Sequence, residues 1–413
     1  MFTKKLFKRD FTMVVIGQII SLFGNSILRF ALPLYLLNET GSAALFGMVS
    51  AISFIPMILL CPVGGIIADR INKRNVMVIL DFSTAALALI CICLLGKINI
   101  VGLIVTVLII LYGIQGAYQP SVQASIPALV ENTELVPANS LVTLVSSLAS
   151  LIGPVIGGTV YSAYGITPVL VVSTICFLAS AIMEMFIKIP YEKKSSDGSI
   201  VSIAVNDMKE GISFIRTKKP IIAHVSLYMA AINLVLSALI VIGLPVIITQ
   251  KLGFDAQTGN KLYGFCQGTL AAGGLLGGLL SGVISKIIKI NKSHIMIFIS
   301  SFALIPIGVT MMLDISPMIT YVIILVCCFI MMIASTFFTI QAIAYAQTIT
   351  PQDLIGKIMS LAMGLCMCAS PLGQAFYGWI FEKMSGSLYI VFFVAAVVSA
   401  IVGAFSRKSL KAM

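Results

Sequence analysis

The chain alternates between long runs of apolar residues and short polar stretches, and this pattern predicts its elements. A helix needs roughly 20 apolar residues to cross the hydrocarbon core of a bilayer. Because open sheets would leave backbone groups unpaired in lipid, we interpret every such run as a helix. The runs cover about residues 11–37, 43–68, 75–96, 99–122, 138–163, 167–189, 221–249, 259–285, 293–313, 317–347, 354–381 and 386–405. The sequence therefore predicts an all-α membrane protein with twelve transmembrane helices.

The longest polar break spans residues 190–219 and divides the predicted helices into six plus six. We expect an N-terminal six-helix bundle over 1–189, a cytoplasmic linker over 190–219 and a C-terminal six-helix bundle over 220–413. The second part of the linker carries apolar residues at Ile203, Ile212 and Ile215. This spacing predicts a short amphipathic helix that lies along the membrane face.

The two halves share short sequence similarities. The stretch "GGIIAD" at 64–69 has a counterpart, "GGLLSG", at 277–282, and "ELVPANSL" at 134–141 corresponds to "DLIGKIMSL" at 353–361. The pairs occur in the same order at similar offsets, which favours an internal duplication and two pseudo-symmetric bundles.

The composition supports a membrane protein. Hydrophobic residues make up 59% of the chain and charged residues 10%, and the mean hydropathy is +1.09. A soluble domain carries about 25% charged residues. The net charge of +11 comes from Lys and Arg that concentrate on one side of the predicted helices. This asymmetry places both termini in the cytoplasm, and it explains the basic balance without a nucleic-acid partner.

The chain lacks the patterns of a cleavable signal peptide and of common catalytic sites. The apolar run after the basic residues 1–10 is too long for a signal peptide and has no small-residue cleavage site. The nine cysteines fall inside predicted helices without zinc-ligand spacing, so we interpret them as packing residues and expect no metal and no cofactor. No phosphate-binding loop or Ser/His/Asp set is present, and we therefore expect a protein that is not an enzyme.

Charged residues gather between the second and third predicted helices, in "GGIIADRINKRNVM" at 64–77. The glycines allow close helix approach, the acid ends one helix, and the bases can anchor the turn to anionic headgroups. The pattern resembles the G-x3-D-R-x-G-R-R signature of the major facilitator superfamily. The matching positions are Gly65, Asp69, Arg70, Asn72, Lys73 and Arg74.

The resemblance implies a conformational latch in this loop and covers the whole chain: twelve helices, cytoplasmic termini and a central linker. Asn72 stands where glycine is usual, and asparagine is the next most tolerant residue in a left-handed turn. The alternative is a positively charged anchor that sets topology and takes no part in switching.

The fifth predicted helix carries a second signature, "SLVTLVSSLASLIGPVIGG" at 140–158. It resembles the antiporter motif of drug-exporting major facilitators at Gly153, Pro154, Gly157 and Gly158, whereas Ser140 and Ala149 replace two glycines. Proline removes a backbone hydrogen bond and bends the helix, and the glycines admit a neighbouring helix. The motif implies export. The alternative is an ordinary kinked, tightly packed helix.

Within the superfamily, the chain resembles the bacterial macrolide-efflux and enterobactin-exporter type. Three stretches carry this resemblance: "GQIISLFGNSIL" at 17–28, "GSA" at 41–43 and "FIP" at 54–56. This resemblance implies a multi-pass protein of the bacterial cytoplasmic membrane that exchanges drugs for protons.

Arg29 lies within the first predicted helix, where a charge is costly. At 100° per residue, Gln18, Asn25 and Arg29 fall within about 40° of one another and form a polar stripe. The first helix lines the cavity in the superfamily, so we expect the stripe to face substrate. Arg29 then attracts an anionic group or responds to a proton through a carboxylate partner; alternatively it reaches the outer headgroups.

Asp81 and Glu184 are the remaining charges within the predicted helices and are candidates for proton coupling. Asp81 either binds a proton or forms a permanent ion pair with the bases of the loop before it, and the ion pair is favoured. Glu184 lies four residues before Lys188, and a surface ion pair between them is favoured.

The fourth, seventh and tenth helices also line the cavity in the superfamily. Amides and phenols in these helices are therefore further candidates for substrate contact, although any one of them can instead bond a neighbouring helix. They are Tyr112, Gln115, Tyr118, Gln119, His224, Tyr228, Asn233, Thr336, Gln341 and Tyr345.

We therefore expect a monomeric secondary transporter that exports amphiphilic drugs or metabolites, macrolide-like in type, in exchange for protons by alternating access. The alternatives are export of an anionic siderophore or movement of lysolipids, with Arg29 as the recognition charge. An alternative of another class is a membrane sensor or scaffold that transports nothing.

Overall fold

The structure is a computed structural model of the chain. It describes residues 8–131, 134–189, 200–284, 290–313, 315–351, 354–384 and 386–411. Side chains are described throughout these ranges except at 61–70, 136, 200–207, 282–284 and 410–411.

The described part of the first half is helical almost throughout. Its helices are α1 (Arg9–Thr40), α2 (Ala43–Arg70), α3 (Lys73–Leu94), α4 (Ile100–Leu129), α5 (Leu135–Tyr164) and α6 (Ile166–Met185). Glycines end two of them at a backbone conformation that side chains disfavour: Gly41 follows α1 with φ +65° and Gly165 follows α5 with φ +79°.

The second half contains α7 (Ile200–Thr217), α8 (Pro220–Ile232), α9 (Ala238–Val246), α10 (Ala256–Ile284), α11 (His294–Met312), α12 (Pro317–Thr348), α13 (Ile355–Lys383) and α14 (Leu388–Lys411). Two π-helical turns, η2 (Asn233–Ser237) and η3 (Ile247–Lys251), join and extend α8 and α9, and a short 3-10 turn, η4 (Ile290–Lys292), precedes α11. The π turns were not expected from the sequence.

Eleven helices in the described ranges are long and apolar enough to cross a membrane. They correspond to eleven of the twelve runs of the sequence analysis. The twelfth run, 259–285, forms α10, which has 29 residues but many glycines and is not among the eleven. The all-α membrane fold is thus confirmed, and the number of twelve spans stays a prediction.

Contacts divide the chain into two compact units. The first comprises Met1–Gly41, Ile52–Asp197 and Ala256–Gly268, and the second comprises Ser42–Ala51, Gly198–Asp255 and Thr269–Met413. Each unit includes a short piece of a helix from the other half of the sequence. The predicted division at 190–219 stays a prediction, because these units do not follow it residue by residue.

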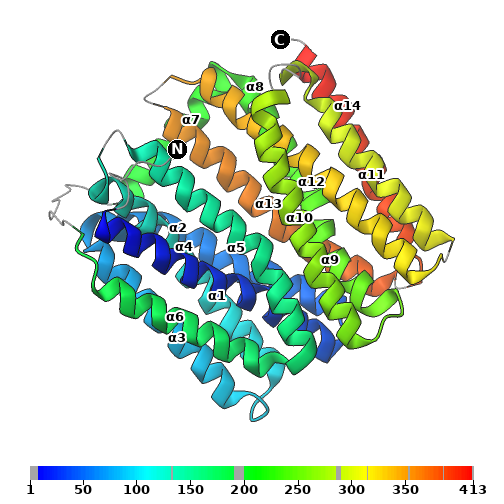
Figure 1. The fold of residues 1–413 in the computed structure, drawn as a ribbon. Coiled ribbons are helices and arrows are strands. Elements are labelled where there is room, and N and C mark those ends of the chain that lie inside the picture. The colour runs from blue at the N-terminus through cyan, green and yellow to red at the C-terminus, as the bar shows by residue number, and fades with distance from the viewer. Residues whose placement is uncertain are drawn as a thin grey trace. The chain divides into compact units, whose positions relative to one another are not determined.

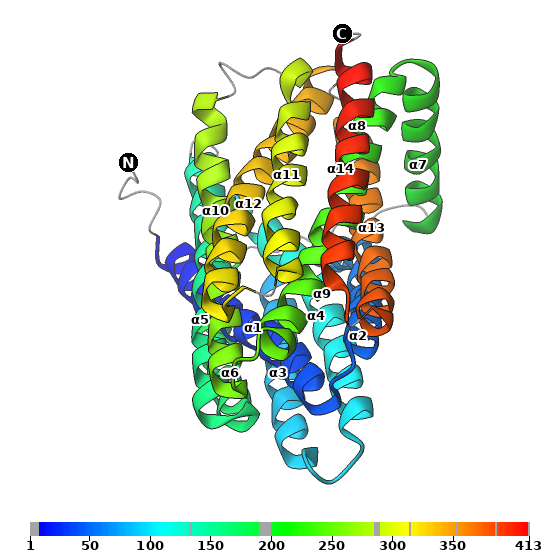
Figure 2. The same cartoon turned by 90° about the vertical axis from the view of Figure 1, so that its right-hand side faces the viewer.

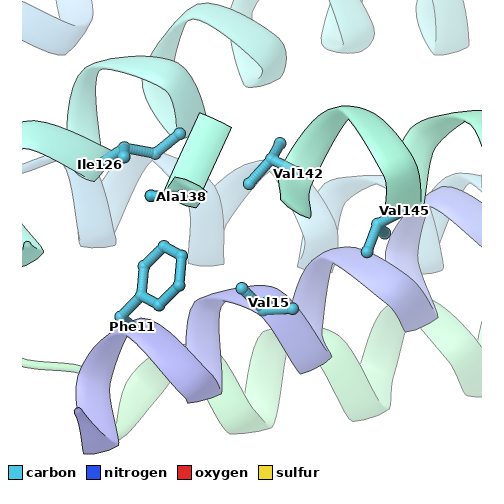
Figure 3. Packing of buried hydrophobic residues seen from close by; sticks show 6 residues of the cluster. All are labelled: Phe11, Val15, Ile126, Ala138, Val142 and Val145. Carbon is cyan, nitrogen blue, oxygen red and sulfur yellow. The ribbon is translucent and has the colours of Figure 1, made fainter. Parts of the chain in front are cut away.

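In the first unit, α1 packs against α5 and α6, and α3 packs along α6 (Figure 1). One core cluster lies at the start of α1, where Phe11 points toward Ala138 of α5 and Ile126 of α4 (Figure 3). Phe11 is completely buried, and between membrane helices such a side chain contributes through van der Waals packing. This cluster holds α1 against the helices that carry the polar residues described below.

In the second unit, α11 lies between α12 and α14, and α13 packs against α8, η2 and α9 (Figures 1 and 2). Small residues permit these contacts. A Cβ atom on Gly308 of α11 would lie 2.9 Å from the ring of Phe393 in α14. The side chain of Phe393 therefore occupies the space that a residue larger than glycine at position 308 would need.

The helix expected within the linker is present as α7. Gly211 faces Leu361 of α13. Glu210 forms an ion pair with Lys357, also of α13, in which Oε2 and Nζ are 2.6 Å apart. Ile203 lies among the side chains outside the description. These contacts place α7 against α13, whereas its position relative to a membrane stays a prediction.

Candidate functional site

Six buried polar residues from four helices form a hydrogen-bonded cluster inside the first unit. We call this set the acid cluster; it consists of Gln18, Ser21, Asp81, Tyr118, Ser180 and Glu184. The helices that contribute are α1, α3, α4 and α6, which pack against one another. The apolar faces of these helices surround the cluster, so its polar atoms depend on each other for hydrogen bonds.

Asp81 of α3 is only 2% exposed, and the hydroxyl of Ser21 donates a 2.9 Å hydrogen bond to its Oδ1 atom. The expected ion pair with the loop bases is not found among the described side chains, which include Lys73 and Arg74. The interpretation was wrong for those two bases because Asp81 points into the bundle, and the side chain of Arg70 lies outside the description.

Glu184 of α6 has no exposed surface. The hydroxyl of Tyr118 donates a 2.8 Å hydrogen bond to its Oε1 atom, and Nε2 of Gln18 donates a 2.9 Å bond to the same hydroxyl. The expected surface ion pair with Lys188 is therefore wrong. Spacing of four residues puts two side chains on one side of a helix, but here α6 ends at Met185, before Lys188.

The polar stripe of α1 contacts α4 at two levels. Gln18 reaches Tyr118, and the guanidinium of Arg29 lies 4.1 Å above the ring centre of Tyr112. Asn25, between them, is 7% exposed. The sequence placed these three residues on one face, and the structure shows that α4 supplies the partner at both ends.

Arg29 is half-buried and forms no ion pair with an acid among the described side chains. Its guanidinium instead stacks on Tyr112, whose ring lies 4.8 Å from that of Phe54 in α2. A cation over an aromatic face is stabilised by about 0.5–2 kcal/mol, depending on how far it is removed from water. This arrangement keeps the positive charge available to an anionic group.

The motif of α5 forms a packing face. The position of a Cβ on Gly153 is already occupied by Ser26 of α1, and Gly157 faces Ile27 and Phe30 of the same helix. On Gly158 a Cβ would lie 3.0 Å from the Cα atom of Gly264 in α10. The glycines thus let α5 touch α1 and α10 at backbone distance; whether this contact serves transport stays a proposal.

The remaining cavity candidates occupy varied positions. The hydroxyl of Tyr228 lies 2.7 Å from that of Ser409 in α14, and Asn233 donates to the carbonyl of Met229 one turn earlier. These two residues therefore contact neighbouring backbone or side chains of their own unit. Gln115 is 8% exposed and buried within α4, whereas three candidates are half-buried: Gln119, Gln341 and Tyr345.

The loop between α2 and α3 differs from expectation at one residue. Asn72 has φ −57°, which is not left-handed, and its side chain accepts a 3.1 Å hydrogen bond from the backbone N–H of Arg74. Asn72 is therefore the N-cap of α3, a position that asparagine favours. The Nε atom of Arg74 is buried without a hydrogen-bond partner. The side chains of Asp69 and Arg70 lie outside the description, as do the surroundings of Gly65.

Comparison with protein families decides which class of protein holds these features. The sequence model of the Major Facilitator Superfamily matches residues 14–374. The chain belongs to this superfamily. As a major facilitator it is a transporter rather than an enzyme, and the predicted family is confirmed.

Relatives and solved structures agree with this assignment. Macrolide efflux protein A of Streptococcus pyogenes is 24% identical over 374 residues, which cover 89% of this chain and 88% of that protein. The enterobactin exporter EntS of Shigella boydii is 28% identical over 161 residues, or 38% of each chain. The crystal structure of the nucleoside transporter NupG matches with a TM-score of 0.74 at 12% identity, covering 98% of this chain and 100% of that chain. The major facilitator described here is a multi-pass protein of the bacterial cytoplasmic membrane.

The loop signature of this major facilitator yields a first prediction. Replacing Asp69 by asparagine is expected to reduce transport about tenfold, equivalent to ~1.4 kcal/mol, because the change removes a charge and keeps the size of the side chain. Transport of a labelled substrate into inverted membrane vesicles, normalised to the amount of protein in the membrane, measures the effect. Asp69→Glu restores the charge and is the control. Full transport by Asp69→Asn would show that the loop is a topological anchor.

Proposed function

We propose that this major facilitator works as a monomer and exports amphiphilic, macrolide-like compounds in exchange for protons. The observation that carries the proposal is the similarity to macrolide efflux protein A, which extends over 89% of the chain. A shared bundle fold alone would leave the substrate class open, since the same fold serves many substrates. The similarity to an exporter and the glycine motif of α5 both favour export.

The interface between α1 and α4 supports a substrate that is partly apolar. Aromatic rings at Tyr112 and Phe54, the amide of Asn25 and the guanidinium of Arg29 occur together in the first unit. Ligand sites typically combine an apolar wall with a few polar groups that fix orientation. These residues are our candidates for substrate contact.

The acid cluster supports coupling to protons. Two carboxyl groups are buried in the first unit, and no described cation forms an ion pair with either of them. Ionisable groups within membrane-spanning helices typically serve ion pathways and proton relays. The transporter would accept a proton there in one orientation of its bundles and release it in the other.

A proteoliposome assay tests the proposed function. The purified chain is reconstituted with a pH-sensitive dye in the lumen, a pH gradient is imposed, and a labelled macrolide is added. We expect uphill movement of the macrolide together with proton movement in the opposite direction. Macrolide movement without proton movement would contradict proton coupling. An absence of flux for macrolides, siderophores and lysolipids alike would favour the sensor or scaffold.

Export of an anionic siderophore is a second candidate function, and Arg29 favours it. Its guanidinium is the positive charge within the described part of α1 between the helix ends, and it has no described acid partner. The similarity to an enterobactin exporter supports the same substrate class. A cation stacked on an aromatic ring is well placed to meet a carboxylate or catecholate.

Replacing Arg29 by glutamine discriminates between the two candidates. If the substrate is anionic, its half-saturation concentration is expected to rise about tenfold, equivalent to ~1.4 kcal/mol, while transport of a neutral compound is unchanged. Competition between a catecholate siderophore and a labelled macrolide measures the selectivity. Lys97→Gln, which removes an exposed cation between α3 and α4, is the control. An unchanged profile would mean that Arg29 only stabilises the contact with Tyr112.

A further inference from the structure

We propose that the coupling proton is bound inside the first unit, between Asp81 and Glu184, and that Tyr118 and Gln18 transmit its presence to α1. This inference rests on the proposed exchange of substrate for protons and specifies where the proton is held. The site lies among α1, α3, α4 and α6. Gln18 and Tyr118 form hydrogen bonds that lead to Glu184, Ser21 donates to Asp81, and the two carboxyl groups are close enough to interact electrostatically.

The acid cluster holds acceptors that no described side chain satisfies. Three oxygen atoms are buried without any hydrogen-bond partner: Oε1 of Gln18, Oδ2 of Asp81 and Oε2 of Glu184. All three are acceptors when the carboxyl groups are ionised. Gln18 has no exposed surface and is already bound to the cluster through its Nε2 atom, so its Oε1 atom is a further acceptor for a proton donor here.

The donors already present in the cluster are committed. The Tyr118 hydroxyl donates to Glu184, and the Ser21 hydroxyl donates to Asp81. The Ser180 hydroxyl donates a 3.1 Å bond to the carbonyl of Gly17, which ties α6 to α1. A proton added to either carboxyl group converts one unpartnered oxygen into an O–H donor. The other unpartnered oxygens then remain as acceptors for this new O–H group.

The charges around the cluster also support proton binding. Its titratable groups are Asp81 on α3, Tyr118 on α4 and Glu184 on α6, and α1 contributes only Gln18 and Ser21. In the described part of the chain, ion pairs join Lys8 to Glu131 and Lys357 to Glu210, both at exposed positions. Two buried carboxylates without a cation repel each other, and a proton on one of them removes that repulsion.

A proton fits this cluster better than a metal cation. Hard cations such as Ca²⁺ and Mg²⁺ take about six or more oxygen ligands. The cluster offers three free oxygens, because one oxygen of each carboxyl group already accepts a hydroxyl hydrogen bond. No group of three or more potential metal ligands of the His, Cys, Asp and Glu types occurs in the described ranges.

The position of the cluster suggests how proton binding is transmitted. Gln18 belongs to the same stripe of α1 as Asn25 and Arg29, and it contacts the cluster through Tyr118. Next to it, a Cβ on Gly17 would lie 3.6 Å from Cγ of Glu184, so α1 and α6 pack closely at the carboxyl group. A proton binds Oε2 of Glu184 and later returns to water. Each of these events rearranges the hydrogen bonds among Gln18, Tyr118 and Glu184, and α1 then shifts against α4 and α6.

The site lies close to one end of α6. Glu184 is the second-last residue of that helix, which ends at Met185. The step is a transfer of H⁺ from water to the Glu184 carboxylate and back, with no other bond made or broken. Tyr118 lies near both carboxyl groups and can turn its hydroxyl from Glu184 toward Asp81, so the proton can reside on either acid.

Infrared spectroscopy of the purified full chain tests the site without requiring transport. Changing the medium from acidic to alkaline should remove the C=O band of a protonated, buried carboxyl group. We expect this change to be lost in Glu184→Gln or Asp81→Asn and retained in Glu131→Gln, which alters an exposed glutamate of the same unit. If the variants do not fold, wild-type protein with ¹³C-labelled glutamate must still show the shifted band. A spectrum without any buried carboxyl change would overturn the proposal.

Transport separates this inference from the proposed function. In proteoliposomes, Glu184→Gln is expected to move a labelled macrolide down its gradient while proton movement is lost. If wild-type protein moves the macrolide without protons, the proposed function fails. If the wild type exchanges protons and Glu184→Gln and Asp81→Asn keep the same proton-to-macrolide ratio, only the site is wrong. Transport that follows Na⁺ and ignores pH would assign the cluster to a monovalent cation instead and would overturn the proton site.

Discussion

Replacing Gly373 by alanine is expected to lower the stability of the folded protein by about 1–3 kcal/mol or more, although it adds only one methyl group. Gly373 of α13 lies directly against the π turn η2. A Cβ atom there would overlap the carbonyl oxygen of Leu234 and would lie 2.6 Å from Cβ of Ala238. Because one of these contacts is with backbone, no side chain can rotate away, and the two helices must separate.

Gly364, in the same helix, provides the matched control. A Cβ on Gly364 meets no heavy atom within 4 Å. Alanine is a better helix former than glycine by about 1 kcal/mol, so Gly364→Ala is expected to be neutral or slightly stabilising. The apparent melting temperatures of both variants in detergent measure the difference. Equal melting temperatures would contradict the backbone contact between α13 and η2.

The positions of the helices follow from the sequence because a bilayer imposes one length on every span. Residue-level ends were less predictable: the run expected over 167–189 forms α6, which already ends at Met185. The π turns carry no comparable signal in the sequence. One of them, η2, packs against α13, where Gly373 lies directly against Leu234, a residue far away along the chain.

Four residues of the acid cluster were candidates from the sequence, whereas Ser21, Ser180 and the connections were missed. Asp81 and Glu184 were each recognised because a charge in an apolar helix needs an explanation. Their partners were sought within a few residues, where spacing gives information, and the ion pairs with Lys73, Arg74 and Lys188 were wrong. The true partners, Ser21 and Tyr118, lie on other helices, and spacing along one helix says nothing about which helices are neighbours.

Asn72 illustrates a different kind of error. Its position in a signature that usually has glycine favoured a left-handed turn. The same residue immediately before a helix also satisfies the preference for asparagine as an N-cap, and the structure follows that preference. The sequence therefore contained the correct signal, and comparison with a family pattern outweighed it. For Arg29 and Gln18, helical periodicity was sufficient, because a shared face depends only on one helix.

Removing the Tyr118 hydroxyl is expected to destabilise the protein by about 1–3 kcal/mol for each polar group left without a partner. Tyr118→Phe leaves Oε1 of Glu184 and Nε2 of Gln18 unpaired, in a cluster that already holds unpartnered oxygens. Hydrogen bonds between membrane helices average only about 0.6 kcal/mol when measured pairwise. The larger loss of stability expected here comes from the buried polar groups that lose their partner. This loss exceeds the free energy that a single hydrogen bond contributes.

A double-mutant cycle distinguishes these two sources of instability. Gln18→Leu removes the amide that Tyr118→Phe would leave unpaired, so the double variant should be more stable than the sum of the single changes predicts, by about 0.5–3 kcal/mol. Thermal unfolding of the wild type, both single variants and the double variant supplies the four values. Tyr164→Phe, which removes the same hydroxyl at a site that is 75% exposed, is expected to change nothing. Strictly additive effects would mean that Gln18 and Tyr118 are not coupled, and the link from the acid cluster to α1 would then lack its first step.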